Sequence, residues 1–226
     1  MKMKNITLTS IALATLASAN VVSAGEIEGN VALGTDYVFR GFSQTDEEIA
    51  ISGGFDYSFE NGFYLGTWGS NVNFGDDASA EIDLYGGYAF EVGGGAEVDL
   101  TYVYYVYPGE TDALNYSEFQ AAVSFNDLTL GLIYSPDYFG SDADAYVLNA
   151  DYSISLADNW GLDLHVGYSD VDQEFFFGED DSYVDYSAAI TTSGAGVDFA
   201  LTYYGTDIDD IEVADDRVVF SISKAF

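Results

Sequence analysis

The sequence predicts an all-β protein, a single antiparallel up-and-down barrel of about 12 strands. Apolar and polar residues alternate with a period of two along the chain, and no stretch has a convincing helical period. Short and long connections alternate between the predicted strands, which is typical of a barrel made of consecutive hairpins. Apolar residues make up 48% of the chain and aromatic residues 16%, too many for an acidic disordered chain.

The beginning of the chain predicts a secretory signal. Lys2 and Lys4 precede an apolar run, and the small-residue stretch "VSA" that ends at Ala24 is typical of a cleavage site. We therefore expect export and cleavage after Ala24, with residues 1–24 taking no part in the fold. No linker or change in composition divides the remainder, which predicts one domain, residues 25–226.

Twelve strands follow from the alternation. Within residues 80–90, for example, Glu81 and Asp83 alternate with Ile82 and Leu84. Only in residues 63–74 are both faces apolar, so the orientation of that strand stays open. In chain order, the predicted strands are residues 30–40, 49–59, 63–74, 80–90, 96–107, 115–125, 128–135, 143–155, 161–171, 182–192, 196–206 and 215–226.

The connections divide into two kinds. Even-numbered predicted strands are followed by short ones ("ENG", "EVGGG", "ND", "LADNW" and "SGA"), and odd-numbered strands by longer, acidic ones. Both ends of the chain then lie on the short-turn side. An outer-membrane barrel has this layout, with short periplasmic turns and longer outer loops. The predicted strand lengths also match the ~9–11 residues that a tilted strand needs to cross a bilayer.

The size of the barrel predicts which face points outward. About eight strands enclose an interior that side chains can fill, and larger barrels enclose a cavity or channel. The polar face of a 12-stranded barrel should therefore line the lumen, and lipid should cover the apolar face. A secreted two-sheet sandwich would also alternate, but the strand number, the rhythm of the connections and the presence of only two prolines favour the barrel.

The charge of the chain restricts its partners. All 39 acidic residues follow Ala24, against three basic ones, Arg40, Arg217 and Lys224, so three minus 39 leaves a formal charge of −36 after processing. Nucleic acid is excluded as a partner, because a basic surface is what binds phosphate. Such acidity attracts cations.

Three segments resemble a known family. They are "VALGTDYVFRGFSQTD", "GGFDYSFENGFYLGTWGSNV" and "EIDLYGGYAFEVG", and they are similar to the TorF-type porin family of proteobacteria. The resemblance implies an outer-membrane β-barrel of a Gram-negative bacterium with a role in transport. It also implies that the terminal Phe226 is the aromatic residue recognised by the outer-membrane assembly machinery. It implies no catalytic residues.

The alternation assigns a set of charged residues to the lumen. Arg40 and Arg217 are expected on neighbouring strands, where they would form a small basic spot in an acidic mouth. One hypothesis is that this spot and its acids narrow the pore, and the other is that the arginines only neutralise carboxylates. The predicted lumen charges are Arg40, Arg217, His165, Asp36, Asp56, Glu81, Asp83, Glu97, Asp99, Glu118, Asp151, Asp163, Asp185 and Asp198.

We predict a passive, cation-preferring channel for small solutes, with outer-membrane lipid around it and no enzymatic activity. One alternative is a non-conducting structural or adhesive barrel. Another is an outer-membrane hydrolase that uses His165, although Ser169 on the same strand face would be ~13 Å away. No cofactor or metal site is expected, since the chain has one histidine and no cysteine. The loop at residues 172–181, "DQEFFFGEDD", is a candidate plug of the lumen.

Overall fold

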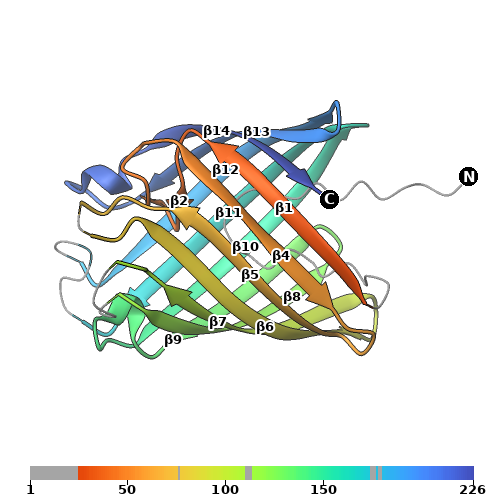
Figure 1. Cartoon of the computed structure of the whole chain (residues 1–226), viewed down its shortest axis with the longest axis horizontal. Coiled ribbons are helices and arrows are strands. Elements are labelled where there is room, and N and C mark those ends of the chain that lie inside the picture. The colour runs from red at the N-terminus through yellow and green to blue at the C-terminus, as the bar shows by residue number, and fades with distance from the viewer. Residues whose placement is uncertain (1–24, 76, 110–113, 174–176, 178–179) are drawn as a thin grey trace, which may run out of the picture.

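The computed structural model describes residues 25–75, 77–109, 114–173, 177 and 180–226. Twelve strands form one closed antiparallel barrel, which confirms the predicted fold class (Figure 1). No helix in these ranges is long and apolar enough to cross a membrane. The barrel strands are β1 (Glu26–Gly34), β4 (Ala50–Ser58), β5 (Phe63–Asn71), β6 (Ala80–Val92), β7 (Ala96–Val106), β8 (Tyr116–Phe125), β9 (Leu128–Ser135), β10 (Ala145–Ala157), β11 (Trp160–Val171), β12 (Ser182–Gly194), β13 (Val197–Thr206) and β14 (Arg217–Ala225).

The first and last strands close the barrel. β1 pairs with β4 on one side, where Gly34 lies opposite Ala50, and with β14 on the other, where Asn30 lies opposite Ala225. The main chain of Phe226 extends this pairing through hydrogen bonds of 2.9 Å in both directions with Gly29. Closure leaves no row of unpaired backbone groups at a sheet edge, and this is the condition for a sheet in hydrocarbon.

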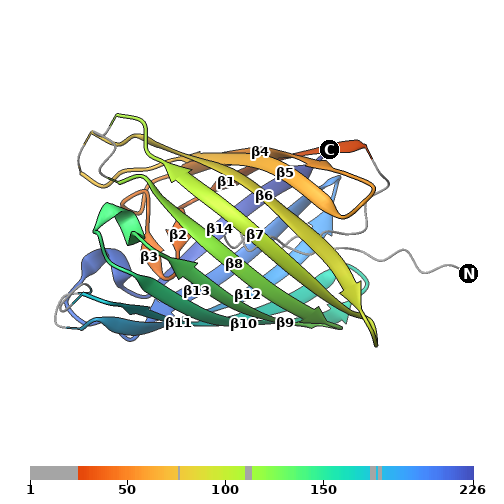
Figure 2. The same cartoon turned by 90° about the horizontal axis from the view of Figure 1, so that it is seen from below.

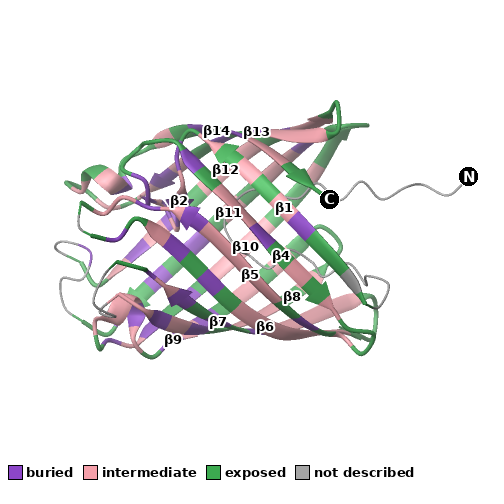
Figure 3. Cartoon of the chain, in the orientation of Figure 1, coloured by how far each residue is buried: buried purple, intermediate pink, exposed green. Residues whose placement is uncertain are grey.

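The apolar face points outward, as predicted. Along β8, the outward Phe119 is 53% exposed, whereas Tyr116 and Glu118 on the inward face are 2% and 0% exposed. Exposed large apolar side chains come from all twelve strands, and buried and exposed positions alternate along the ribbons (Figure 3). In β5, whose sequence left the faces open, Phe63 and Leu65 point outward and Tyr64 is buried.

The predicted first strand, residues 30–40, is wrong in its second half. β1 ends at Gly34, and residues 35–49, which we call the inner loop, turn into the barrel. Within this loop β2 (Val38–Phe39) and β3 (Phe42–Ser43) form a small hairpin. Its turn residues, Arg40 and Gly41, have φ angles of 47° and 85°, which a two-residue hairpin turn requires. Figure 2 shows β2 and β3 inside the ring of strands, at the end with the long connections.

Candidate functional site

The lumen is filled near the long-loop end by an aromatic cluster. The cluster includes Tyr105 at the end of β7, Tyr116 at the start of β8 and Tyr183 of β12. The inner loop is packed into it. Phe39 lies edge-on to Tyr105, with ring centroids 6.2 Å apart, and Phe42 lies edge-on to Tyr183 at 5.3 Å. This half of the lumen is thus a packed core.

An ion pair fixes the tip of the inner loop to the wall. Arg40 Nη1 lies 2.8 Å from Glu118 Oε1, and Nη2 lies 3.0 Å from Oε2, so the pairing is bidentate. Glu118 is 0% exposed and also accepts hydrogen bonds from the Tyr105 hydroxyl and the Gln120 amide. Burial works against the charged form of Arg40, but the Glu118 carboxylate outweighs it and raises the Arg40 pKa above its ordinary value. The guanidinium therefore stays charged.

The base of the inner loop is held by a second ion pair. Arg217 Nη1 lies 3.1 Å from Asp36 Oδ2, and Asp36 Oδ1 accepts hydrogen bonds of 2.7 Å from Ser43 and Thr45. The expectation that Arg40 and Arg217 come from neighbouring strands is wrong, because Arg40 lies on the hairpin inside the barrel. Each arginine instead has a carboxylate of its own.

Two further hydrogen bonds tie the inner loop to the wall. The Tyr37 hydroxyl donates to Glu81 Oε1 of β6 at 2.8 Å, and the Tyr183 hydroxyl of β12 donates to the Arg40 carbonyl at 2.8 Å. Burial raises the pKa of Tyr37 well above its usual range, and the nearby carboxylates of Glu81 and Asp83 raise it further. Tyr37 therefore remains a donor. The loop is bonded at its tip, middle and base.

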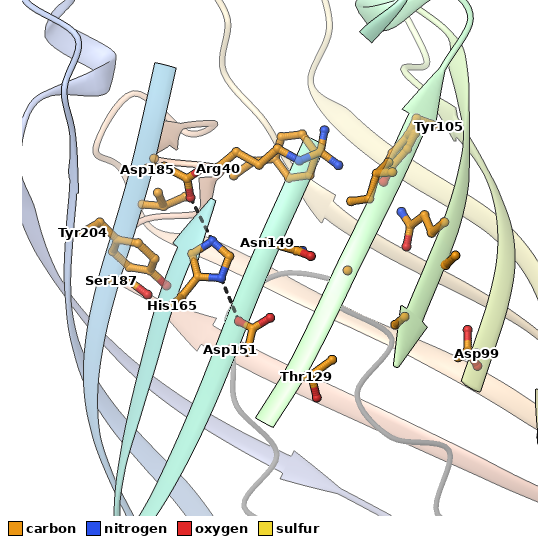
Figure 4. Close-up of a pocket in the computed structure, with 18 residues that line it drawn as sticks. Arg40, Asp99, Tyr105, Thr129, Asn149, Asp151, His165, Asp185, Ser187 and Tyr204 are labelled. Atoms are coloured by element: carbon orange, nitrogen blue, oxygen red, sulfur yellow. Dashed lines mark hydrogen bonds and ion pairs between the residues drawn. The ribbon is translucent and has the colours of Figure 1, made fainter. Parts of the chain in front are cut away.

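A second polar group lies on the lumen wall beneath the inner loop. His165 of β11 stands between Asp151 of β10 and Asp185 of β12, with Nδ1 2.7 Å from Asp151 Oδ1 and Nε2 3.0 Å from Asp185 Oδ1 (Figure 4). The register of the sheet sets this arrangement, since Asp151 is the direct cross-strand partner of His165. Both ring nitrogens are engaged by carboxylates. Neither is left to activate a hydroxyl nucleophile such as Ser169.

These groups border a cavity of about 100 Å³, the lumen cavity. The inner loop forms its upper wall through Phe39, Arg40 and Gly41, and its sides include Asp151, His165 and Asp185. Figure 4 shows Arg40 above the histidine and Asp99 across the space. Among the described residues, no group of three or more His, Asp or Glu side chains is placed to hold a metal ion.

Asp83 of β6 is buried opposite Tyr105 at the long-loop end, and its Oδ1 has no hydrogen-bond partner. The other predicted lumen acids lie toward the short turns, and most of them bond to neighbouring side chains. Asp99 accepts from the Tyr64 hydroxyl at 2.8 Å, and Glu97 occupies the same face of β7. The other pairs are Asp56 with Tyr85, Asp163 with Ser153, and Asp198 with Ser193. Of the predicted plug at residues 172–181, Phe177 is buried against Phe42 and Tyr183, while residues 174–176 and 178–179 lie outside the described residues.

The sequence did not reveal the inner loop or the wall tyrosines that surround it. The signal was present in "VFRGFS", where a residue–glycine pair stands between apolar residues, as in a two-residue hairpin turn. The continuing alternation of Tyr37, Phe39 and their neighbours concealed it.

Residues 18–226 match the family Gcw_chp, described as a bacterial protein of unknown function. The chain belongs to the Gcw_chp family. Among curated proteins, none matches this Gcw_chp chain.

Solved structures similar to the Gcw_chp barrel are outer-membrane porins and channels. The NanC porin matches with a TM-score of 0.56 and 7% identity, over 88% of this chain and 98% of that one. The KdgM porin, solved in complex with disordered oligogalacturonate, matches with a TM-score of 0.56 and 10% identity over the same shares. The COG4313 outer-membrane channel from Pseudomonas putida F1 matches with a TM-score of 0.50 and 10% identity, over 92% and 99%. At these identities the similarity concerns the fold.

Proposed function

We propose that this Gcw_chp barrel is an outer-membrane, porin-like channel for the passive diffusion of small solutes, with a preference for cations. The observation that carries the proposal is a closed 12-stranded barrel with an apolar outer face and a carboxylate-lined lumen. The porin fold of the similar structures and the TorF-type resemblance of the first strands support it.

The outward apolar face supports a location in the outer membrane. Residues such as Leu130 and Leu132 of β9 are about half exposed without a membrane, and acyl chains are the surroundings that favour them. The predicted signal agrees with export. The exposed ring of Phe226, at the end of the closing strand, supports recognition by the assembly machinery.

The position of the inner loop in the lumen favours a channel that is gated. The loop and the aromatic cluster occupy the lumen near the long-loop end, so a solute passes only when the loop moves aside. With the loop in place, the Arg40–Glu118 pair lies within the filled part of the lumen, which supports the hypothesis that Arg40 narrows the pore. Release of the loop breaks this pair and the hydrogen bonds of Tyr37 and Tyr183.

The pairing of both lumen arginines with carboxylates favours a preference for cations. Arg40 and Arg217 are both neutralised by carboxylates, so the remaining lumen acids, among them Asp99, Asp151 and Asp163, set the sign of the field. Carboxylates along a pore concentrate cations and repel anions.

The test is conductance in a planar bilayer. Protein extracted from outer membranes should give discrete current steps in KCl and should let small sugars enter liposomes. A folded barrel that gives neither would contradict the channel. It would favour the second candidate, a non-conducting structural or adhesive barrel, which the filled half of the lumen also fits.

A further inference from the structure

The wall of the lumen cavity holds hydrogen-bond acceptors that lack donors. Asp185 Oδ2 and Asn149 Oδ1 have no hydrogen-bond partner, although Asp185 is only 3% exposed. Both residues line the cavity. A buried acceptor without a donor is unfavourable, because it has lost its hydrogen bonds to water.

The donors near these acceptors are already committed. His165 gives one nitrogen to Asp151 and the other to Asp185 Oδ1. The Arg40 guanidinium bonds to both oxygens of Glu118. His165 donates from both nitrogens only as the charged imidazolium, and with Arg40 it is fully engaged, so the wall has acceptors to spare.

Both acceptors lie in the space that two glycines leave free of a side chain. A Cβ added at Gly131 of β9 would fall on Asn149 Oδ1, and one added at Gly167 of β11 would fall on Asp185 Oδ2. The two oxygens therefore occupy the space over these glycines, and each must turn away from its glycine to face the cavity. Asp151 is open already, with its side chain 33% exposed.

The charge of the cavity selects the sign of a ligand. Asp99, Asp151 and Asp185 line it, and His165, paired with the last two, offsets one of these three negative charges. The charge of Arg40 is balanced by Glu118. A second anion is disfavoured here, and a cation is attracted. A bare metal ion is a poor match, because the described acids and histidine form no cluster suited to one.

We propose that the lumen cavity is a binding station for a small organic cation with several N–H donors, of the guanidinium or primary ammonium class. Asp151 receives the cation, and Asp185 Oδ2 and Asn149 Oδ1 turn to accept its remaining N–H groups. A planar guanidinium presents such donors in a fixed fork and is only weakly hydrated. The inference rests on the proposed channel for the passage of this solute, and binding itself does not require conduction.

The test is calorimetric titration of the full barrel in detergent micelles with two salts. Methylguanidinium chloride should bind saturably with one site per chain. Tetramethylammonium chloride has the same charge and no N–H group, and it should bind at least about tenfold more weakly, because hydrogen bonds to charged groups account for that much. Equal affinities for both salts, or no saturable binding of methylguanidinium, would overturn the proposal.

Two variants locate the site. Asp151→Asn and Asp185→Asn should each weaken methylguanidinium binding about tenfold or more. Asp158→Asn is the matched control, since it removes the same charge from the exposed turn between β10 and β11 and should leave binding unchanged. Far-ultraviolet circular dichroism checks that each variant is a folded barrel. An equal loss of methylguanidinium affinity in all three variants would mean that the cation is attracted by the overall negative charge, and it would contradict a site in the cavity.

Bilayer currents of the same preparation separate this inference from the proposed function. A KCl current without methylguanidinium binding would support the channel and contradict the binding site. Methylguanidinium binding without a current would support the binding site and contradict the channel.

Discussion

Arg40 combines a strained backbone with a buried charge. Its φ of 47° is unusual for a residue other than glycine, and its side chain is 8% exposed against a Glu118 side chain that is 0% exposed. Such a conformation persists only where surrounding contacts hold it. Here the contacts are the bidentate pair, the Phe39 ring 4.5 Å from the guanidinium and the Tyr183 hydroxyl on the carbonyl.

Breaking this pair on one side should cost more than removing both charges. Glu118→Gln leaves the Arg40 charge buried without its partner, which costs about 3–5 kcal/mol. The double variant Arg40→Gln/Glu118→Gln leaves no buried charge at this position and should be more stable than Glu118→Gln. Urea unfolding in detergent measures the free energies, with Lys224→Gln, an exposed basic residue, as the control. A double variant less stable than Glu118→Gln would contradict the role of the buried charge.

At the scale of elements, the inner loop differs from the barrel strands in how it is held. The hairpin of β2 and β3 has only two paired positions, so its own backbone pairing is too short to stabilise it. Its stability comes from ion pairs, tyrosine hydroxyls and aromatic rings on the wall. An element held in this way can leave its place as a unit, and the barrel strands cannot.

A disulfide should lock the inner loop in place. A Cβ added at Gly41 would lie 3.7 Å from the Thr206 Cβ of β13, within the ~3.5–4.5 Å of natural disulfides. The chain has no cysteine, so the bond in Gly41→Cys/Thr206→Cys would be the only one. Oxidation should suppress channel opening in a planar bilayer, and dithiothreitol should restore it. The two single variants control for the strain of a side chain at Gly41, whose φ is 85°. Undiminished opening of the oxidised protein would show that the loop is not the gate.

At the scale of the whole molecule, the excess of acid acts through the lumen. Each of the two arginines is neutralised by a carboxylate. Further carboxylates lie along the length of the barrel, from Asp198 near the short turns to Glu81 near the long loops. Acidic side chains therefore outnumber basic ones along the lumen.

Under a KCl gradient, the reversal potential should shift toward the equilibrium potential of potassium. The shift should diminish at ~1 M salt, where the screening length falls to ~3 Å. A reversal potential on the chloride side would refute the cation preference. Lys224→Gln should leave the potential unchanged, since Lys224 is exposed at the end of β14 and outside the lumen.

Patterns within single strands were enough to predict the barrel. Residues 128–135 were predicted as a strand and form β9, and Leu100 of β7, which was predicted on the apolar face, is 48% exposed. Strand geometry places successive side chains on opposite faces, so a period of two in the sequence predicts which residues share a face. The strand number and the loop rhythm then led to closure, because an unpaired edge is costly in lipid.

Contacts distant in the sequence decided the rest. The alternation of residues 35–43 is compatible with a longer first strand. Remote residues, among them Glu118, 78 residues beyond Arg40, and Tyr183, hold the inner loop inside the barrel. The Asp151–His165–Asp185 group likewise depends on the register of three strands, which no single strand encodes. Periodicity assigns a side chain to a face, whereas its partner across the lumen is set only when the sheet closes and brings remote strands together.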